Sequence, residues 1–367
     1  MAGRTPDLLV LSASGAVQPS AIVSALAAVA GAVPAIGFSA GGELGPAGAT
    51  SGHIAVFALG GGFSVATASA DVGEHGPGGA GEGAAECVRG VRSSPHQVLL
   101  VLTDGAAGDQ QEVLRGAYRA AGAAVPLVGG AGGGSDDGHS WQLEGGQVRR
   151  NAVVAAAVGS PAPFGLGVGH GWQPHGRPML VTVSNGRIVH ALDDRPALDV
   201  YLEQLRVAEG RAAPEGGEDP LGHDIAAFRA AAVSHPLGLS RRSGQLIRSV
   251  VDADLNTGSL VCAAEVPQGA LVSLMGGNVA SVLTGTSDAV LAALAGLAGQ
   301  PALGLLAFDC VARRHILGAT GTTDESALIS AAAPRTPWVG TYTFGEIARA
   351  QGLNGFHNKT LVVLAVA

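Results

Sequence analysis

The segments Val33–Glu43 (VPAIGFSAGGE) and Thr336–Glu346 (TPWVGTYTFGE) share one pattern near opposite ends of this chain of 367 residues. Each begins with Pro-x-[Ile/Val]-Gly and ends with a Gly-Glu pair. A helical pattern precedes each segment, and a strand-like apolar run follows each, at His53–Leu59 and Thr360–Val366. A shorter copy, VPLVGG, occupies Val125–Gly130. We interpret the pattern as one helix-to-strand turn repeated in duplicated α/β lobes, with Glu43 and Glu346 in comparable turns.

Short apolar runs bounded by Gly and Pro alternate with Ala-rich helical stretches along the chain. The expected strands include Asp7–Leu11, Ala35–Phe38, Gln97–Thr103, Gly304–Asp309 and Leu361–Val366. The expected helices include Pro19–Ala32, Asp109–Ala121, Pro196–Leu205, Ser287–Leu297 and Glu325–Ala332, with Ser20, Asp109 and Ser287 as caps. This alternation predicts a mixed α/β (α+β) fold of two related lobes, residues 7–190 and 191–367, with mixed sheets flanked by helices. Asn185-Gly186 also predicts a hairpin.

Composition excludes several classes of protein. Hydrophobic residues make up 47% of the chain and charged residues 14%, which is typical of a globular protein with a substantial core. The net charge is −8, Lys359 is the one lysine, and basic residues cluster no further than pairs, so we expect no nucleic-acid partner. Residues 8–42 carry no charge, but two prolines interrupt them, so we expect no membrane span.

The three cysteines, Cys87, Cys262 and Cys310, share no metal-binding spacing. An odd number of unspaced cysteines is typical of free thiols in a reducing compartment. We therefore expect a cytoplasmic protein without an intrachain disulfide, and no metal site.

The Gly-Glu pairs and the serine near the first of them are candidate chemical positions. Glu43 and Glu346 lie at strand ends, where a carboxylate either caps backbone N–H groups or faces a ligand pocket. Gly37-Phe-Ser39-Ala-Gly41 matches the nucleophile elbow of hydrolases, but an elbow requires a helix directly after the serine. Gly41-Gly42-Glu43 follows instead, which favours a turn at Ser39.

Cys310, Arg313 and Arg248 are polar or reactive groups in strand-like surroundings. Cys310 follows an expected strand, and Arg313 lies three residues further on, so the thiol is either reactive or a buried small apolar group. Arg248 lies inside a strand pattern, where a charge needs a partner or a ligand. His170 and His175 flank Trp172 in a Gly-rich loop, and these rings either stack on a ligand or fill the edge of a core.

An ordered set of motifs resembles the FIST domain proteins, with both the N-terminal and the C-terminal segment, from about residue 8 to the end. The motifs are Ile36–Glu43, Gly165–Pro174, Leu192–Tyr201, His235–Gly238, Arg248, Phe308–Arg313, Gly340–Glu346 and Phe356–Thr360. The resemblance implies an intracellular sensory module for small ligands such as amino acids. In larger proteins of the family such a module is joined to an output domain. This chain departs from that pattern, so we expect a stand-alone module that signals through a partner protein in trans.

Two alternatives stay open beside the binding module. One is an enzyme in which Cys310 or Glu346 acts with Arg248 and Arg313 on a small carboxylate. The other is a haem-binding nitric oxide sensor with an axial histidine from His170, His235 or His357, since the resemblance implies haem in one subgroup. No catalytic set and no haem-attachment motif is visible in the sequence.

We predict one cleft between the lobes for an anionic or zwitterionic ligand the size of an amino acid. Guanidinium groups bind carboxylates bidentately, and a glutamate binds an ammonium group. The residues predicted to line the cleft are His170, Trp172, Arg248, Cys310, Arg313, Tyr342, Glu346 and Asn358.

Overall fold

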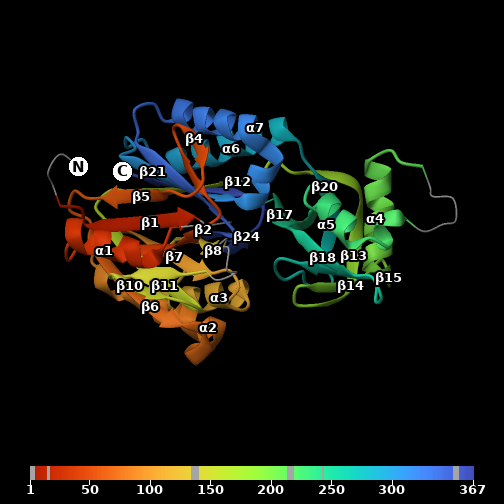
Figure 1. Ribbon diagram of the computed structural model, residues 1–367, viewed down its shortest axis with the longest axis horizontal. Helices are drawn as coiled ribbons and strands as arrows, with labels where there is room; N and C mark the ends of the chain where they lie inside the picture. Colours follow the sequence, from red (N-terminus) through yellow and green to blue (C-terminus); the bar gives the residue numbers. More distant parts are fainter. Residues whose placement is uncertain (1–4, 15–16, 134–139, 213–218, 242–243, 350–354) are drawn as a thin grey trace. The chain divides into compact units, whose positions relative to one another are not determined.

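The computed structural model describes residues 5–14, 17–133, 140–212, 219–241, 244–349 and 355–367. The chain forms two compact units that interleave along the sequence. The large unit contains residues 1–170, 283–356 and 360–367, and the small unit contains residues 171–282 and 357–359. Helices and strands are mixed throughout, which confirms the predicted fold class (Figure 1). The lobe boundary between residues 190 and 191 stays a prediction.

The large unit contains three copies of one strand–helix–strand motif, each followed by a short hairpin and a returning strand. The first copy is β1 (Leu8–Ser14), α1 (Pro19–Val29), β2 (Ala35–Ala40), β3 (Glu43–Gly45), β4 (Gly48–Thr50) and β5 (Ile54–Leu59). The second is β7 (His96–Asp104), α3 (Gln110–Ala121), β8 (Leu127–Gly132), β9 (Gln142–Glu144), β10 (Gln147–Arg149) and β11 (Ala152–Ser160). The third is β21 (Gly304–Cys310), α7 (Val311–Ala332), β22 (Trp338–Thr343), β23 (Glu346–Arg349), β24 (Gly355–His357) and β25 (Leu361–Val366).

The three copies exchange their hairpins in a cycle. In each copy the first two strands are parallel and the returning strand is antiparallel to the first. The sheets have the orders β10-β9-β2-β1-β5, β24-β23-β8-β7-β11-β6 and β12-β25-β21-β22-β3-β4, where β6 is Ser64–Asp71 and β12 is Phe164–Gly169. The sheet of each copy thus takes the hairpin of another copy, as in a pseudo-threefold arrangement.

Backbone hydrogen bonds repeat with the same cycle. The bonds that join a copy to the next hairpin are Ser39 N to Trp141 O, Ala131 N to Gly345 O and Tyr342 N to Gly42 O. The bonds from the motif proline to the first strand are Leu9 N to Pro34 O, Leu99 N to Pro126 O and Leu305 N to Pro337 O, at 2.9–3.0 Å. The repeated Pro-x-[Ile/Val]-Gly sequence therefore marks one repeated backbone arrangement.

The glycine of that motif permits the close approach of the two parallel strands. A Cβ atom at Gly37 would lie 2.9 Å from the carbonyl oxygen of Leu11. A Cβ atom at Gly129 would lie 1.9 Å from the carbonyl oxygen of Val101, and Gly129 also has a φ of +153°. The same position of the third copy, Gly340, is adjacent to Ala307. Glycine is thus required by geometry where the sequence repeats it.

The three sheets pack their inner faces into one shared hydrophobic core. Its members come from all three sheets and include Val10, Phe38, Leu100, Val154, Phe308 and Leu364. Helices cover the outer faces: α1 on the first sheet, α2 (Val72–Ala85) with α3 on the second, and α6 (Val279–Ala295) with α7 on the third. Side chains alternate between the two faces along each strand, so adjacent residues serve different layers.

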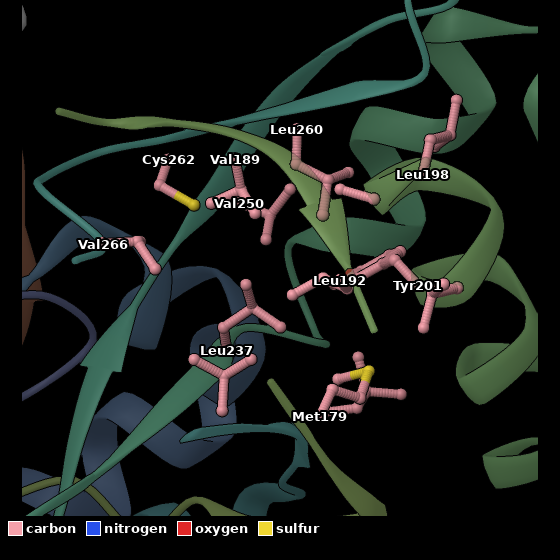
Figure 2. Close-up of a cluster of buried hydrophobic side chains, with 14 of the residues drawn as sticks. Met179, Val189, Leu192, Leu198, Tyr201, Leu237, Val250, Leu260, Cys262 and Val266 are labelled. Carbon is pink, nitrogen blue, oxygen red and sulfur yellow. The ribbon is translucent and has the colours of Figure 1, made fainter. Parts of the chain in front are cut away.

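The small unit is built on an antiparallel sheet with the order β17-β16-β20-β13-β14-β19-β18. Its strands are β13 (Gln173–Asn185), β14 (Ile188–Leu192), β16 (Leu237–Arg241), β17 (Gly244–Arg248), β18 (Val250–Asp254), β19 (Ser259–Cys262) and β20 (Leu271–Gly276), with β15 (Arg195–Pro196) beside β14. Its helices are α4 (Ala197–Ala208) and α5 (Ile225–Ala232). Figure 2 shows its core, in which Met179, Val189 and Tyr201 lie among aliphatic side chains. The predicted hairpin at Asn185-Gly186 is confirmed.

The repeat that indicated duplicated lobes lies within one unit. All three copies of the motif belong to the large unit, and the antiparallel small unit has a different topology. The physical reason is the hairpin exchange, because each hairpin pairs with a strand of another copy and so holds the copies together. The shorter copy at Val125–Gly130 is a full member of the repeat.

Several helix starts also differ from the sequence prediction. Asp109 caps α3 as predicted, and its side chain accepts from Gln111 N. Ser287 lies inside α6, where its hydroxyl donates to Leu283 O. Gln18, not Ser20, is the N-cap of α1. Helix α7 starts at Val311, well before the predicted residue 325. Gly318 interrupts the helical pattern of the sequence, so the pattern predicts only the part of the helix that follows it.

Candidate ligand-binding site

Cys310 and Glu346 form a buried pair at the ends of strands in the third copy. Cys310 ends β21 and is the N-cap residue of α7, and Glu346 begins β23. The Glu346 carboxylate is hydrogen-bonded to the Cys310 thiol. It also accepts from Thr343 Oγ1 at 2.9 Å and from Thr360 N and Oγ1 at 3.2 and 2.9 Å. Glu346 therefore caps a backbone N–H, which is one of the two roles that the sequence left open.

Burial changes the acidity of Glu346. The side chain is fully buried, and this desolvation raises its pKa from 4.5 to about 7. The hydrogen bonds from Thr360, Thr343 and Cys310 favour the ionised carboxylate and oppose the shift. The carboxylate is therefore poised to change its protonation state near neutral pH.

Glu43 occupies the equivalent turn of the first copy. Its carboxylate accepts from Ser14 N at 3.0 Å, from Ser14 Oγ at 2.5 Å and from Thr50 Oγ1 at 3.2 Å. Ser14 ends β1 as Cys310 ends β21, and a glycine with positive φ precedes each glutamate. The prediction that the two glutamates lie in comparable turns is confirmed.

A layer of buried charges lies at the outer face of the third sheet. Arg313 of α7 donates through Nε to Asp309 Oδ1 at 2.6 Å, and through Nη2 to Glu325 Oε1 at 2.6 Å and Thr286 Oγ1 at 2.7 Å. The three charged side chains are fully buried. Burial and the neighbouring Glu325 raise the pKa of Asp309 well above its usual value, although Arg313 opposes the shift.

The two carboxylates of this layer affect each other. The neighbouring Glu325 raises the pKa of Asp309, and Arg313 lowers it. Asp309 Oδ2 and Glu325 Oε2 have no hydrogen-bond partner among the described residues. The raised pKa of Asp309 favours its neutral form, which reduces the excess negative charge of a buried cluster of two carboxylates and one arginine.

Tyr342 and Arg314 lie next to this charged layer. Burial strongly raises the pKa of Tyr342, and within the described residues its hydroxyl has no hydrogen-bond partner. The Arg314 guanidinium lies 5.0 Å from the centre of the Tyr342 ring. It donates to Gly41 O at 2.8 Å and to Ser51 Oγ at 3.0 Å. Arg314 forms no ion pair with a carboxylate in the part of the chain that the structure describes.

A groove of about 720 Å³ opens beside Arg314. Its walls are the β3–β4 hairpin, at residues 47–49, and the first half of α7, at residues 311–323. The polar side chains that line it are those of Arg314, His315, Thr322 and Thr323. Helix α7 bends at this point, because Gly318 has the non-helical angles φ 60° and ψ −169°. Sequence patterns do not predict this groove, and the Arg313-Arg314 pair is the one feature that marks the segment.

The predicted site residues are divided between the two units. Five of them belong to the large unit: His170, Cys310, Arg313, Tyr342 and Glu346. In that unit Cys310 meets Glu346, and Arg313 donates to the backbone oxygen of His170 at 3.3 Å. None of the five is among the described residues that line the groove.

Trp172, Arg248 and Asn358 belong to the small unit. Trp172 Nε1 donates to Lys359 O at 3.0 Å, directly after Asn358. Arg248 is 2% exposed and donates to Glu265 O and Ile247 O at 2.9 and 3.1 Å. The convergence of all eight residues on one cleft stays a prediction, as do the enzyme and the haem sensor.

Ser39 lies near the end of β2, close to the turn that the sequence favoured. Ser39 Oγ accepts from Trp141 N at 3.0 Å, and the strand β3 follows it instead of the helix of a nucleophile elbow. All three cysteines are free and buried in the structure. Burial raises the pKa of Cys87 to about 11 and that of Cys262 to about 12, so both thiols are protonated at neutral pH.

Comparison with known proteins finds curated relatives that match part of this chain. Curated relatives include an uncharacterized protein of Methanocaldococcus jannaschii, 36% identical over 84 residues that make up 22% of this chain and 16% of the relative. An uncharacterized protein of Mycobacterium tuberculosis, found in two strains, is 29% identical over 215 residues, or 58% of this chain and 54% of the relative. The match thus spans about half the length of the mycobacterial relatives. Within the described residues, no helix combines the length and the apolar character that crossing a bilayer requires.

The family models match nearly the whole chain. The FIST N domain matches residues 7–195, and the FIST C domain matches residues 197–349. FIST domains are generally regarded as sensory domains that bind small ligands. The two matches follow one another in the order that the sequence motifs predicted, and the chain belongs to the FIST domain family.

Proposed function

We propose that this FIST protein is a sensor that binds a small, amino-acid-like ligand through its carboxylate in the groove beside Arg314. The observation that carries the proposal is an arginine that no carboxylate of the described residues neutralises, at the wall of a cavity of suitable size. Small-molecule sites have volumes of about 300–1,000 Å³. The groove volume of about 720 Å³ lies within that range.

Arg314 is held in place without being neutralised. Its contacts with Gly41 O, Ser51 Oγ and the Tyr342 ring fix the guanidinium plane but add no negative charge. A guanidinium has five N–H donors, so further donors are available to a ligand carboxylate. A bidentate arginine–carboxylate pair is among the strongest charge-assisted contacts in proteins. His315 follows directly and lines the same groove.

The threonines that line the groove suit the amino group of such a ligand. The hydroxyls of Thr322 and Thr323 both donate to Ala319 O, which leaves their oxygen lone pairs as acceptors. An ammonium group requires acceptors of this kind. A carboxylate at Arg314 and an ammonium at the threonines together describe a zwitterion.

The position of the groove gives the ligand a route to a conformational effect. Its two walls belong to different copies of the repeat, since the β3–β4 hairpin comes from the first copy and α7 from the third. A ligand that contacts both walls favours conformations in which they are close together. Helix α7 also carries Arg313, so its movement reaches the buried charges at the third sheet.

Binding is tested with amino acids and small carboxylic acids as probes. The full chain is melted with each probe, and hits are titrated calorimetrically against the wild type, Arg314→Ala and Arg229→Ala. Arg229 is a matched control because it is an exposed arginine in the small unit, where it pairs with Asp252. We expect a hit that raises the melting temperature of the wild type, because binding to the folded state stabilises it.

The variants decide where the hit binds. Loss of a charge-assisted pair of about 1.5–3 kcal/mol weakens binding roughly ten- to a hundredfold in Arg314→Ala. Arg229→Ala should bind as the wild type does. The proposal fails if Arg314→Ala keeps its ligand-free melting temperature and binds the probe with wild-type affinity, or if no probe stabilises the wild type.

A further inference from the structure

The pseudo-threefold arrangement leaves one sheet edge open. In the second and third sheets the returning strands β11 and β25 carry a further antiparallel strand along their whole length, β6 and β12 respectively. The equivalent strand of the first sheet is β5, and among the described residues β5 ends that sheet. The first sheet therefore lacks the strand that both related sheets have.

The open edge of β5 presents unpaired backbone groups. Leu59 O accepts from Asp7 N beside β1, so the peptide groups of Leu59, Phe57 and Ala55 face β1. In an antiparallel ladder the residues between them face the other way. The N–H and C=O groups of Ile54, Val56 and Ala58 therefore point to the open edge, and no described residue bonds to them.

The side chains at this edge are apolar and uncovered. Ile54 is 43% exposed and Val56 is 47% exposed, whereas every residue of β11 and β25 is buried. The strand has the sequence IAVFAL, without charge or proline. Natural sheets usually protect an exposed edge with charged residues, proline or a bulge, and an unprotected apolar edge pairs readily with another strand.

We propose that β5 is a dimer interface, at which it pairs antiparallel with β5 of a second copy of this chain. The edges of β11 and β25 each pair with an antiparallel strand. The repeated sheet therefore has room for an antiparallel strand at the equivalent edge of β5. A twofold axis brings two identical open edges together and satisfies the outward groups of both. The twofold axis passes either through the Val56 pair or through the Phe57 pair of the two β5 strands. In both registers Ile54, Val56 and Ala58 of the two copies lie on one face, because opposite residues of an antiparallel pair share a face.

The test measures the oligomeric state of the full chain by light scattering and sedimentation. We expect the wild type to have twice the chain mass of 36.1 kDa. Val56→Lys places like charges across the axis and should weaken dimerisation by at least about tenfold. Val251→Lys is the matched control, because Val251 is 44% exposed on β18, which is also the end strand of its sheet. This control should remain a dimer.

Two further measurements keep the result independent of folding. Ala58→Lys should disrupt the dimer as Val56→Lys does, and both variants should keep the melting temperature of a wild type diluted to monomers. Amide exchange at Ile54, Val56 and Ala58 should slow as the wild-type concentration rises. A wild type that is monomeric at every concentration, or a dimer that survives both substitutions, overturns the proposal. Pairing of this edge with another protein would appear as the first of these outcomes.

Discussion

The turns that contain Glu43 and Glu346 have the same backbone arrangement, but their glutamates have different hydrogen-bond partners. Both glutamates follow a glycine with positive φ and are hydrogen-bonded to the last residue of a first strand, Ser14 or Cys310. In the first copy the partner is Ser14, through its hydroxyl and its backbone N–H. In the third copy the partners include the Cys310 thiol, and desolvation raises the pKa of Glu346 to about 7. The repeat thus positions a carboxylate, and the neighbours determine its acidity.

A second difference lies one residue earlier on the same strands. The register makes Ala13, Thr103 and Asp309 equivalent in the three copies. Only Asp309 is charged, and it forms the buried layer with Arg313 and Glu325. The groove with Arg314 lies on the same helix as Arg313. At this position of the repeat the third copy therefore has a charged residue, where the first copy has an alanine and the second a threonine.

The largest expected effect comes from removing the cation of the buried layer. Arg313→Met leaves two carboxylates without their arginine, and breaking a buried ion pair in this way costs about 3–5 kcal/mol. Urea unfolding at pH 7 measures the loss. Arg229→Met, at an exposed pair with Asp252, should cost at most about 1 kcal/mol. Equal losses in the two variants would contradict the buried charge layer.

The pKa of Glu346 predicts a pH dependence of stability. Because the folded pKa of about 7 exceeds the unfolded value of 4.5, this group contributes stability that is complete below pH 4.5 and is lost as pH rises through 7. The shift corresponds to about 3 kcal/mol. The free energy of unfolding, measured from pH 4.5 to 8 for the wild type and Glu346→Gln, should diverge by this amount. Parallel curves for the two proteins would show that Glu346 titrates normally.

The motif glycines give a graded test of the three copies. A Cβ atom would lie 1.9 Å from a backbone oxygen at Gly129 and 2.9 Å from one at Gly37, whereas at Gly340 its closest neighbour is the Ala307 Cβ at 3.1 Å. Overpacking costs about 1–3 kcal/mol. Alanine substitutions should therefore destabilise in the order Gly129, Gly37, Gly340, as measured by denaturant unfolding. Any other order would indicate that the three strand pairs are not packed alike.

The smallest effect is expected from a substitution that gives the Glu346 turn of the third copy the hydroxyl partner that Glu43 has in the first copy. Cys310→Ser replaces a weak thiol donor by a hydroxyl, which stabilises the ionised Glu346 and lowers its pKa. The pH midpoint of the Glu346-linked stability change should move to lower pH, with a change of less than about 1 kcal/mol at pH 5. Cys87→Ser is the control, since Cys87 lies elsewhere in the large unit. An unchanged pH midpoint would show that the Cys310 thiol does not affect the pKa of Glu346.

Local patterns predicted much of the fold correctly. The final strand, Leu361–Val366, has the predicted bounds, and the Asp109 cap and the Asn185-Gly186 hairpin are where the sequence placed them. Each of these features depends on residues close in sequence. The sequence pattern does not predict α7 before residue 325, because Gly318 and Gly321 interrupt the helical pattern. Packing against the third sheet stabilises this part of the helix in the structure.

The sequence by itself determined the fold class, the family and the repeated turn, because each follows from residue order and periodicity. Only the tertiary structure decided that the three copies share one unit, since hairpin exchange joins strands far apart in the chain. It also decided the partners of the buried charges. Asp309, Thr286 and Glu325 meet around Arg313 because α6 and α7 cover the same sheet face, and Arg314 lines a groove because Gly318 bends α7. Contacts of this kind depend on how distant segments pack, which residue order alone does not specify.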